Sequence, residues 1–172
     1  FIAEGTVVLD HLLRSQRFRP TSLFLLKNRV AGIADRLALV PHDVPIFVAD
    51  RAVMDLVAGF AIHRGVLAHA VDRLAGRTED ERANGRGDVA GVADFLALFR
   101  NAAAFGASGV VLDGASCHPL YRKAIRVSVG TALTLPFHHG ADIPAIRQGL
   151  ERSGHRPLAL SPRGDTDLAD VK

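Results

Sequence analysis

The chain has 172 residues, of which 48% are hydrophobic and only 6% aromatic, so we expect a globular protein with a largely aliphatic core. Its apolar runs are too short to cross a membrane and its single cysteine, Cys117, excludes an internal disulfide, which together favour a cytoplasmic protein without a membrane partner. The net charge of +3 and the isoelectric point near 9.6 favour an anionic partner without identifying it.

The first 70 residues alternate between helical and strand-like patterns. Apolar spacing predicts helices over 9–13, 30–38 and 50–59, and apolar runs predict strands over 22–26, 46–49 and 60–69. Asp50 is placed to cap the third helix and Gly59 to end it. Residues 1–70 are therefore predicted to form a small α/β domain.

Charged residues and glycines dominate 71–91, which cannot bury enough apolar surface to order itself and is predicted to be a linker. After it the alternation resumes. Helices are predicted over 92–105, 119–127 and 143–153, and strands over 109–112, 131–135 and 157–160. Short strands separated by helices indicate a second α/β domain, 92–172, with a parallel sheet.

The predicted helix 92–105 is apolar nearly all round and should be buried on most sides, yet it carries Arg100 and Asn101 in its middle. A guanidinium there needs a polar partner. From spacing alone, the favoured interpretation is an arginine that reaches solvent or pairs with a carboxylate such as that of Asp94.

Two linked segments give this helix a second interpretation. The first is Phe-Arg-Asn-Ala-Ala-Ala-Phe-Gly at 99–106, followed by Gly-Val-Val-Leu-Asp at 109–113. The second is Pro-Leu-Tyr-Arg-Lys-Ala-Ile-Arg-Val-Ser-Val-Gly at 119–130, which leads to Leu-Thr-Leu-Pro-Phe at 133–137. Both resemble signatures of the SpoU (TrmH-like) family of S-adenosylmethionine-dependent RNA methyltransferases. Glu4-Gly5, Gly59-Phe60 and the run His-Arg-Gly-Val-Leu-Ala at 63–68 are similar to the substrate-binding domain of many SpoU enzymes.

The resemblance implies 2′-O-methylation of a ribose in RNA, with ribosomal RNA as the first expectation and transfer RNA as the alternative. It implies that S-adenosylmethionine is held by a trefoil knot in the second domain, that the protein is a homodimer, and that the first domain is similar to ribosomal proteins that bind RNA bends. The knot rests on the resemblance alone, because such topologies are exceptions to the usual rules.

Arg100 occupies the position of the family's essential arginine, which implies a catalytic role. A guanidinium with a pKa above ~12 stays charged, so we expect it to orient a phosphate and to stabilise the developing oxyanion rather than to act as a base. Asn101 follows this arginine in many members. Asp94 stands where the signature has an asparagine and Leu96 where it has a glycine, so both positions depart from the pattern.

Two later signatures of the family, Gly-x-Glu-x-x-Gly and Ser-Leu-Asn-Val, are absent from the chain. We therefore expect the second domain to be C-terminally incomplete, and the chain as written to bind cofactor weakly and to be inactive, either as a fragment or as a degenerate relative. The remaining candidates for cofactor contact are Leu160, Ser161 and Pro162, in the loop after the last predicted strand.

Basic residues suited to RNA phosphates lie in three places. They are Arg14, Arg17 and Arg19 near the first helix, His63 and Arg64 before the last strand of the first domain, and Arg122, Lys123 and Arg126 in the second signature. A solvated surface explains the first group equally well, and a turn that requires Gly65 explains the second nearly as well. Ser128 and Gly130 are expected to permit tight packing at a helix end.

The adjacent histidines His138 and His139 lack a convergent set of Cys, Asp or Glu, so no metal is expected. A second hypothesis is a catalytically inactive RNA-binding or ribosome-associated homologue, in which Asp94 and Leu96 mark a dead site. A third hypothesis, a small-molecule α/β enzyme, is the weakest because the chain has no phosphate-binding glycine loop.

Overall fold

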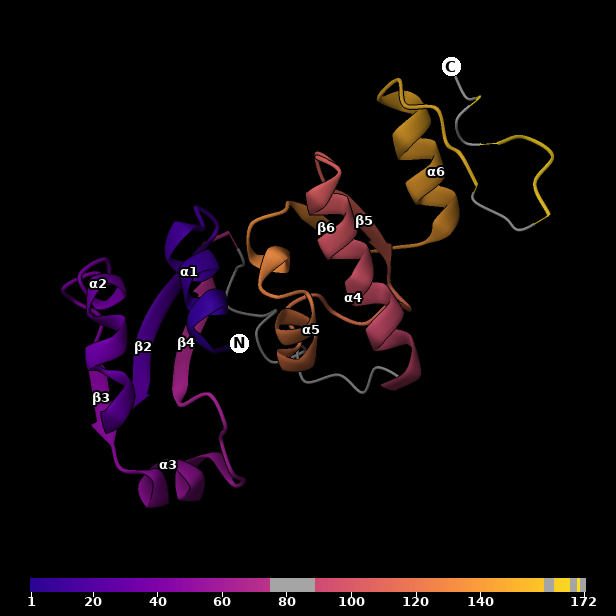
Figure 1. Cartoon of the computed structure of the whole chain (residues 1–172). Coiled ribbons are helices and arrows are strands. Elements are labelled where there is room, and N and C mark those ends of the chain that lie inside the picture. Colours follow the sequence, from indigo (N-terminus) through magenta and orange to yellow (C-terminus); the bar gives the residue numbers. More distant parts are fainter. Residues whose placement is uncertain (75–88, 160–162, 168–169, 171–172) are drawn as a thin grey trace.

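The computed structural model describes residues 1–74, 89–159, 163–167 and 170, and it describes side chains in the helix that begins at Val89 only from Ala97 onward. Within this part of the chain there are two β-sheets, one of four strands in the order β1-β4-β2-β3 and one made of β5 and β6 (Figure 1). Among the described helices, none has both the length and the apolar character that a bilayer crossing requires.

The four-stranded sheet is formed by the first 72 residues. Its elements are β1 (Ile2–Glu4), α1 (Thr6–Arg14), β2 (Phe18–Leu26), the 3₁₀ turns Lys27–Arg29 and Ala31–Ile33, α2 (Ala34–Leu37), β3 (Ile46–Ala49), α3 (Arg51–Ala58) and β4 (Val66–Asp72). β4 is antiparallel to β1 and β2, whereas β3 is parallel to β2. Strands β1, β2 and β3 therefore point the same way, and their carboxyl ends meet at one edge of the sheet, which we call the carboxyl edge.

Helix α1 supplies much of the core of this sheet. Its residues Val8, Leu9 and Leu12 are buried, as the helical spacing predicts, and they join Leu23 and Leu25 of β2 in one apolar cluster. Burial of side chains of this size contributes roughly 1.5–3 kcal/mol each, which fixes α1 on the sheet. A smaller cluster under α3 consists of Leu26, Met54 and Ile62.

The two-stranded sheet is parallel, with Val110 opposite Phe137. Its elements are α4 (Val89–Ala104), β5 (Val110–Asp113), α5 (Arg122–Val127), the 3₁₀ turn Thr131–Leu133, β6 (Phe137–Ala141) and α6 (Ile143–Arg152). Asp142 accepts a hydrogen bond from the Ala145 amide at 2.7 Å and so caps α6. Phe99 of α4 is fully buried against Val110, Leu112 and Leu135.

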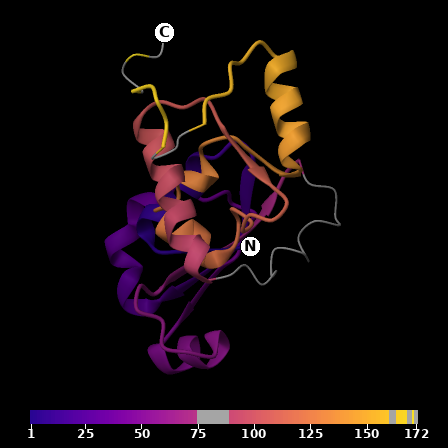
Figure 2. The same ribbon diagram turned by 90° about the vertical axis from the view of Figure 1, so that its right-hand side faces the viewer.

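The two sheets share core residues. Leu120, Ile125 and Leu133, from α5 and its flanks, belong to the same apolar cluster as the buried side chains of α1, β2 and β4. In Figure 1 α5 lies between α4 and the four-stranded sheet, and in the view turned by 90° α4 lies in front of both (Figures 1 and 2). The second half of the chain is thus packed directly against the first.

The structure corrects several predicted elements. Residues 131–135 are not a strand: the backbone turns at Gly130, with a φ of +87°, into the 3₁₀ turn, and the strand is 137–141. Leu133 is buried in the core of the first sheet, Ala132 and Leu135 are buried in that of the second, and Thr134 is exposed. A short apolar run does not distinguish a strand from such a turn. Strand β4 begins at Val66 rather than at Phe60, and residues 157–159 are not in a strand, while Leu160 lies outside the described residues.

Three further differences concern helices and the first strand. Residues 30–38 form one 3₁₀ turn and one short helix instead of a continuous helix, and the helix predicted from Pro119 begins at Arg122. Strand β1 was not predicted, because three residues carry too little pattern. Of the predicted linker 71–91, Val71 and Asp72 belong to β4, residues 89–91 begin α4, and 75–88 lie outside the described residues.

Candidate functional site

Helix α4 presents Arg100 and Asn101 to solvent. The helix buries a single stripe, with Phe99 at 0% exposure and Ala102 half-buried, while Leu98 is 47% exposed. The expectation that this helix is buried on most sides is therefore wrong for its described part. Successive residues of a helix are about 100° apart around its axis. Arg100 therefore points away from the apolar cluster that Phe99 enters. The side chain of Asp94 lies outside the described residues.

The loop after β5 is organised by Asp113. Its carboxylate accepts hydrogen bonds from the Ser116 hydroxyl at 2.5 Å and the Ser116 amide at 2.8 Å. These two bonds lower the pKa of Asp113 below its ordinary value. The His139 ring from β6 contacts the Ser116 carbonyl at 3.0 Å and lies 5.0 Å from the His118 ring. These contacts hold the carboxyl ends of β5 and β6 together.

Helix α5 joins the second sheet to the carboxyl edge of the first. Arg122 donates to the buried carboxylate of Glu4 at 2.8 Å, and its guanidinium lies 4.7 Å from the centre of the Phe60 ring. The charge of Arg122 is therefore partly used within the protein. Lys123 is half-buried and Arg126 is exposed on the same helix.

His63 and Arg64 are exposed at the carboxyl edge, in the loop that precedes β4. The turn behind them requires Gly65, which has a φ of +67° and where a Cβ would lie 2.5 Å from Leu26 Cδ1. The Arg64 side chain passes over Gly5. The turn explanation of this triplet thus has a structural basis, and the two exposed side chains remain available to a ligand.

Arg14, Arg17 and Arg19 lie at the opposite end of the same sheet, so the predicted RNA-binding residues divide into two groups. Arg17 donates through Nε to Asp72 at 2.7 Å and through Nη1 to the Phe137 carbonyl at 3.3 Å, and it stacks 4.5 Å from the Phe137 ring centre. Arg19 forms an ion pair with Asp43. Arg14, at the end of α1, is exposed.

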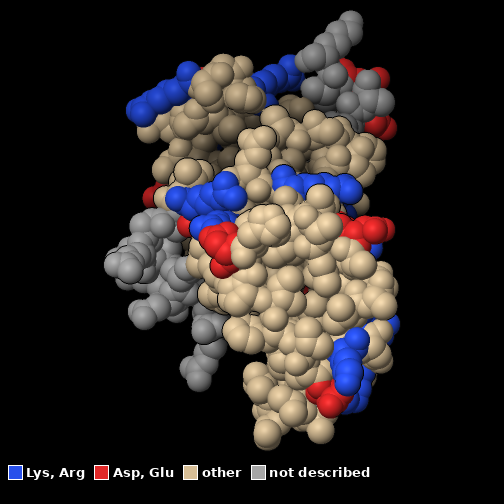
Figure 3. All heavy atoms as spheres, turned by 90° about the vertical axis from the view of Figure 1, so that its left-hand side faces the viewer, with Lys and Arg blue, Asp and Glu red and all other residues tan. Residues whose placement is uncertain are grey.

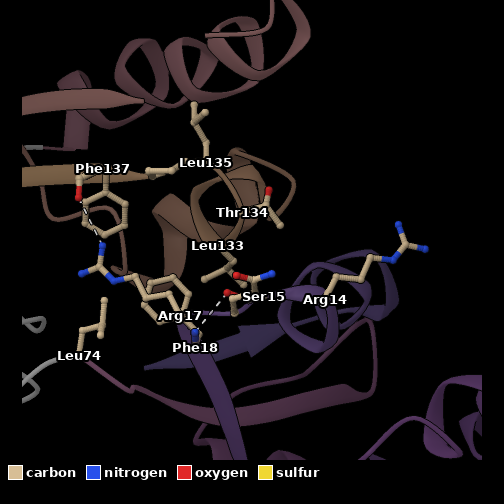
Figure 4. Close-up of a pocket in the computed structure, with 11 residues that line it drawn as sticks. Arg14, Ser15, Arg17, Phe18, Leu74, Leu133, Thr134, Leu135 and Phe137 are labelled. Atoms are coloured by element: carbon tan, nitrogen blue, oxygen red, sulfur yellow. Dashed lines mark hydrogen bonds between the residues drawn. The ribbon is translucent and has the colours of Figure 1, made fainter. Parts of the chain in front are cut away.

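A pocket of about 510 Å³ opens beside Arg14 and Arg17, between the end of α1 and the segment that leads into β6 (Figure 4). Its walls include Leu133, Thr134 and Phe137, which sequence reasoning did not assign to a site. The only sequence signal for them was the Leu-Thr-Leu-Pro-Phe run of the second signature.

The surface over α2, β3 and α3 carries few charged side chains in its middle, between groups in which Lys or Arg lie beside Asp or Glu (Figure 3). Ile46, Phe47 and Val48 of the edge strand β3 are all exposed there. The predicted cofactor residues Leu160, Ser161 and Pro162 lie outside the described residues, so the structure gives no contact for them. In the described ranges, no three His, Cys, Asp or Glu side chains converge as a metal site would require.

A scan of protein-family models found no match to this chain. A search of curated proteins found an uncharacterized tRNA/rRNA methyltransferase of Mycobacterium tuberculosis, which is 40% identical over 170 residues, covering 95% of this chain and 58% of the relative. A protein of Mycobacterium bovis with the same description has the same identity and coverage. The chain spans somewhat more than half the length of these relatives.

Solved structures share the fold. The SpoU methyltransferase AviRb from Streptomyces viridochromogenes, in complex with the cofactor AdoMet, superimposes with a TM-score of 0.70 at 20% identity, covering 100% of this chain and 69% of AviRb. The predicted resemblance to the SpoU/TrmH methyltransferases is confirmed at the level of the fold. An AdoMet-bound rRNA methyltransferase from Sinorhizobium meliloti gives a TM-score of 0.57 at 18% identity over 87% of this chain and 57% of that protein.

Proposed function

We propose that this protein is an S-adenosylmethionine-dependent RNA methyltransferase that modifies a ribose 2′-hydroxyl, with ribosomal RNA as its substrate. The observation that carries the proposal is the match of the whole chain to the SpoU fold, together with a 40% identical relative described as a tRNA/rRNA methyltransferase. Arg100 stands exposed at the signature position, where it is free to meet RNA.

In this proposal residues 1–70 bind RNA and residues 92–172 carry the transfer reaction. S-adenosylmethionine supplies an electrophilic methyl group when it is bound, and Leu160, Ser161 and Pro162 are the proposed contacts. Arg100 holds the phosphate next to the target ribose and stabilises the negative charge that develops on its 2′-oxygen. Asn101 and Asp94 complete this part of the site.

A trefoil knot, a ribosomal-protein-like first domain and a homodimer belong to the proposal as features that SpoU resemblance implies. Light scattering coupled to gel filtration tests the dimer directly, since a dimer has twice the mass of the chain. A monomeric mass at micromolar concentration would contradict it.

For RNA contact we propose the carboxyl edge as the main surface, through His63, Arg64, Lys123 and Arg126. Arg122 is attracted to Glu4, and its guanidinium is less able to neutralise a phosphate than an unpaired one. By the same argument Arg17 and Arg19, which are paired with Asp72 and Asp43, contribute less to phosphate binding than Arg14.

The second candidate is an inactive RNA-binding homologue. It is favoured by Asp94 and Leu96, which replace the signature's asparagine and glycine. A carboxylate repels RNA phosphate and lacks the donor that an amide offers. Binding of RNA occurs under both candidates, whereas binding of cofactor separates them.

The deciding experiment uses the protein expressed from its complete coding sequence. S-adenosylmethionine is titrated calorimetrically, and methyl transfer to ribosomal RNA is followed with a labelled methyl group. Arg100→Ala should lower the transfer rate by at least about 100-fold with cofactor binding unchanged, because loss of one oxyanion-stabilising donor has effects of that size. Arg152→Ala, which removes an exposed arginine from α6, is the matched control and should leave the rate unchanged. Cofactor binding without any transfer by the wild type, or RNA binding without cofactor binding, would favour the inactive homologue.

A further inference from the structure

The pocket beside Arg14 and Arg17 is lined by residues from both halves of the chain. It lies where the first sheet meets the second, and its volume of about 510 Å³ is within the range of pockets that hold small organic groups. Figure 4 shows its walls coming from two distant parts of the chain, with Arg14, Ser15, Arg17 and Phe18 on one side and Leu133, Thr134, Leu135 and Phe137 on the other.

The two arginines of the pocket have different electrostatic roles. The guanidinium of Arg17 is held by Asp72, whose side chain is 5% exposed, and by the Phe137 carbonyl. Its charge is therefore offset and its position fixed. Arg14 is exposed, and among the described residues it takes part in no ion pair. Arg14 is thus the cation of this pocket that an anion can reach.

The remainder of the wall is suited to a flat, partly apolar group. Leu74 and Leu135 provide an apolar surface, the planar guanidinium of Arg17 lies over the Phe137 ring, and Gln16 and Thr134 provide donors and acceptors nearby. Nucleobases that leave the stack in single-stranded RNA are commonly held by such a combination of ring stacking and hydrogen bonds to base edges.

We propose that this pocket accepts one unstacked nucleotide of the RNA substrate, with the base against Leu135 and the Arg17 guanidinium that covers Phe137, and a neighbouring phosphate on Arg14. The inference rests on the proposed function, because it takes RNA as the ligand. An RNA nucleotide fits the pocket better than an apolar peptide side chain, because the nucleotide supplies both a planar ring and a negatively charged phosphate that Arg14 can bind. The pocket then forms a second contact with RNA, at the end of the four-stranded sheet opposite the carboxyl edge.

The test compares two RNA probes by fluorescence anisotropy with the 172-residue chain. One is a labelled hairpin with a single-stranded loop of mixed sequence, and the other is the same hairpin with abasic loop positions. The wild type should bind the intact loop at least about tenfold more tightly than the abasic loop, because base stacking in such sites has effects of this order. Thr134→Trp fills the pocket from an exposed position and should reduce this preference to less than about twofold, whereas the matched Thr134→Ser should retain it.

A second pair of variants tests the phosphate contact without a change in pocket shape. Arg14→Gln should weaken binding of both hairpins and lower the slope of log affinity against log salt by about one, whereas Arg152→Gln on α6 should change neither. RNA binding with equal affinity for the two loops, or a base preference that survives Thr134→Trp, would overturn the pocket inference while the proposed function stands. Failure of the wild type to bind either hairpin at low salt would overturn both the inference and the RNA-binding part of the proposed function.

Discussion

Replacement of Gly130 by alanine tests how tightly the two halves of the chain are joined. Gly130 follows α5 in the second signature, and its φ of +87° lies in the left-handed region that favours glycine. A Cβ at this position would lie 2.8 Å from His11 Cδ2, 3.1 Å from Cγ and 3.2 Å from Cβ. Because the contact includes the base of the His11 side chain, rotation of the ring alone does not relieve it.

The expected magnitude has two parts. Left-handed backbone strain at an alanine costs about 1–2 kcal/mol, and overpacking of a close contact costs about 1–3 kcal/mol. The loss of unfolded-state freedom that accompanies a Gly-to-Ala change returns about 0.4–1 kcal/mol. Gly130→Ala should therefore lower the free energy of unfolding by about 1–5 kcal/mol.

Gly59→Ala is the matched control. Gly59 also has a positive φ, +77°, but a Cβ there meets no atom within 4 Å. Its replacement should cost only the backbone strain, about 1 kcal/mol. Chemical denaturation followed by circular dichroism measures both variants, and the difference between them, about 1–3 kcal/mol, isolates the contact with His11.

A double-mutant cycle with His11→Ala completes the test. In that background Gly130→Ala should cost nearly as little as Gly59→Ala, because Cδ2 and Cγ of His11 are removed and only its Cβ, 3.2 Å away, remains. Equal costs for Gly130→Ala and Gly59→Ala in the wild-type background would refute the reasoning, since they would mean that α1 does not pack closely on the end of α5.

Three further predictions concern the same region and are measured by denaturation. Glu4→Gln should lower the free energy of unfolding by about 1–2 kcal/mol. The loss is smaller than for a fully buried ion pair because the Arg122 side chain is 33% exposed and can reach solvent, and an unchanged free energy would mean that the pair contributes nothing. Val129→Asn should raise the free energy of unfolding by about 1 kcal/mol, because the φ of Val129 is +56° and asparagine tolerates that region better; a loss of stability would contradict this. Burial, followed by the nearby charge of Arg14, lowers the pKa of His11 below its ordinary value of 6.5. The unfolded chain therefore binds more protons at this histidine than the folded chain, so the contribution of neutral His11 to stability is present above pH ~6.5 and falls as the pH is lowered. His11→Gln should reduce the slope of the free energy of unfolding against pH between pH 7 and 5.

Some of the candidate site was readable from the sequence because its signals are local. Strand 46–49 and the end of α3 at Gly59 follow from an apolar run and a terminal glycine, which act within a few positions. Helix α3 does begin after Asp50, but the predicted cap is wrong, because the Asp50 side chain makes no capping hydrogen bond. The need for Gly130 at a helix end was also predicted, and the contact with His11 confirms it. The signature around Arg100 pointed to the SpoU fold, which the solved structures share.

Other features were decided by contacts between residues far apart in the chain. Arg17 and Arg122 look like surface cations in the sequence, but Asp72 and Glu4, 55 and 118 residues away, bring them into ion pairs. The segment 131–135 looks like a strand, yet it is a turn whose Leu133 packs into the core of the first sheet and whose Ala132 and Leu135 pack into that of the second.

The sequence by itself thus determined the α/β class and several elements, since secondary-structure propensity and the residues that end a helix are short-range properties. Only the tertiary structure decided which charges are paired, that the two sheets share a core, and that a pocket opens between Arg14 and Phe137. The reason is physical: ion pairing and burial depend on which distant surfaces meet, and no local pattern in the chain encodes the partner.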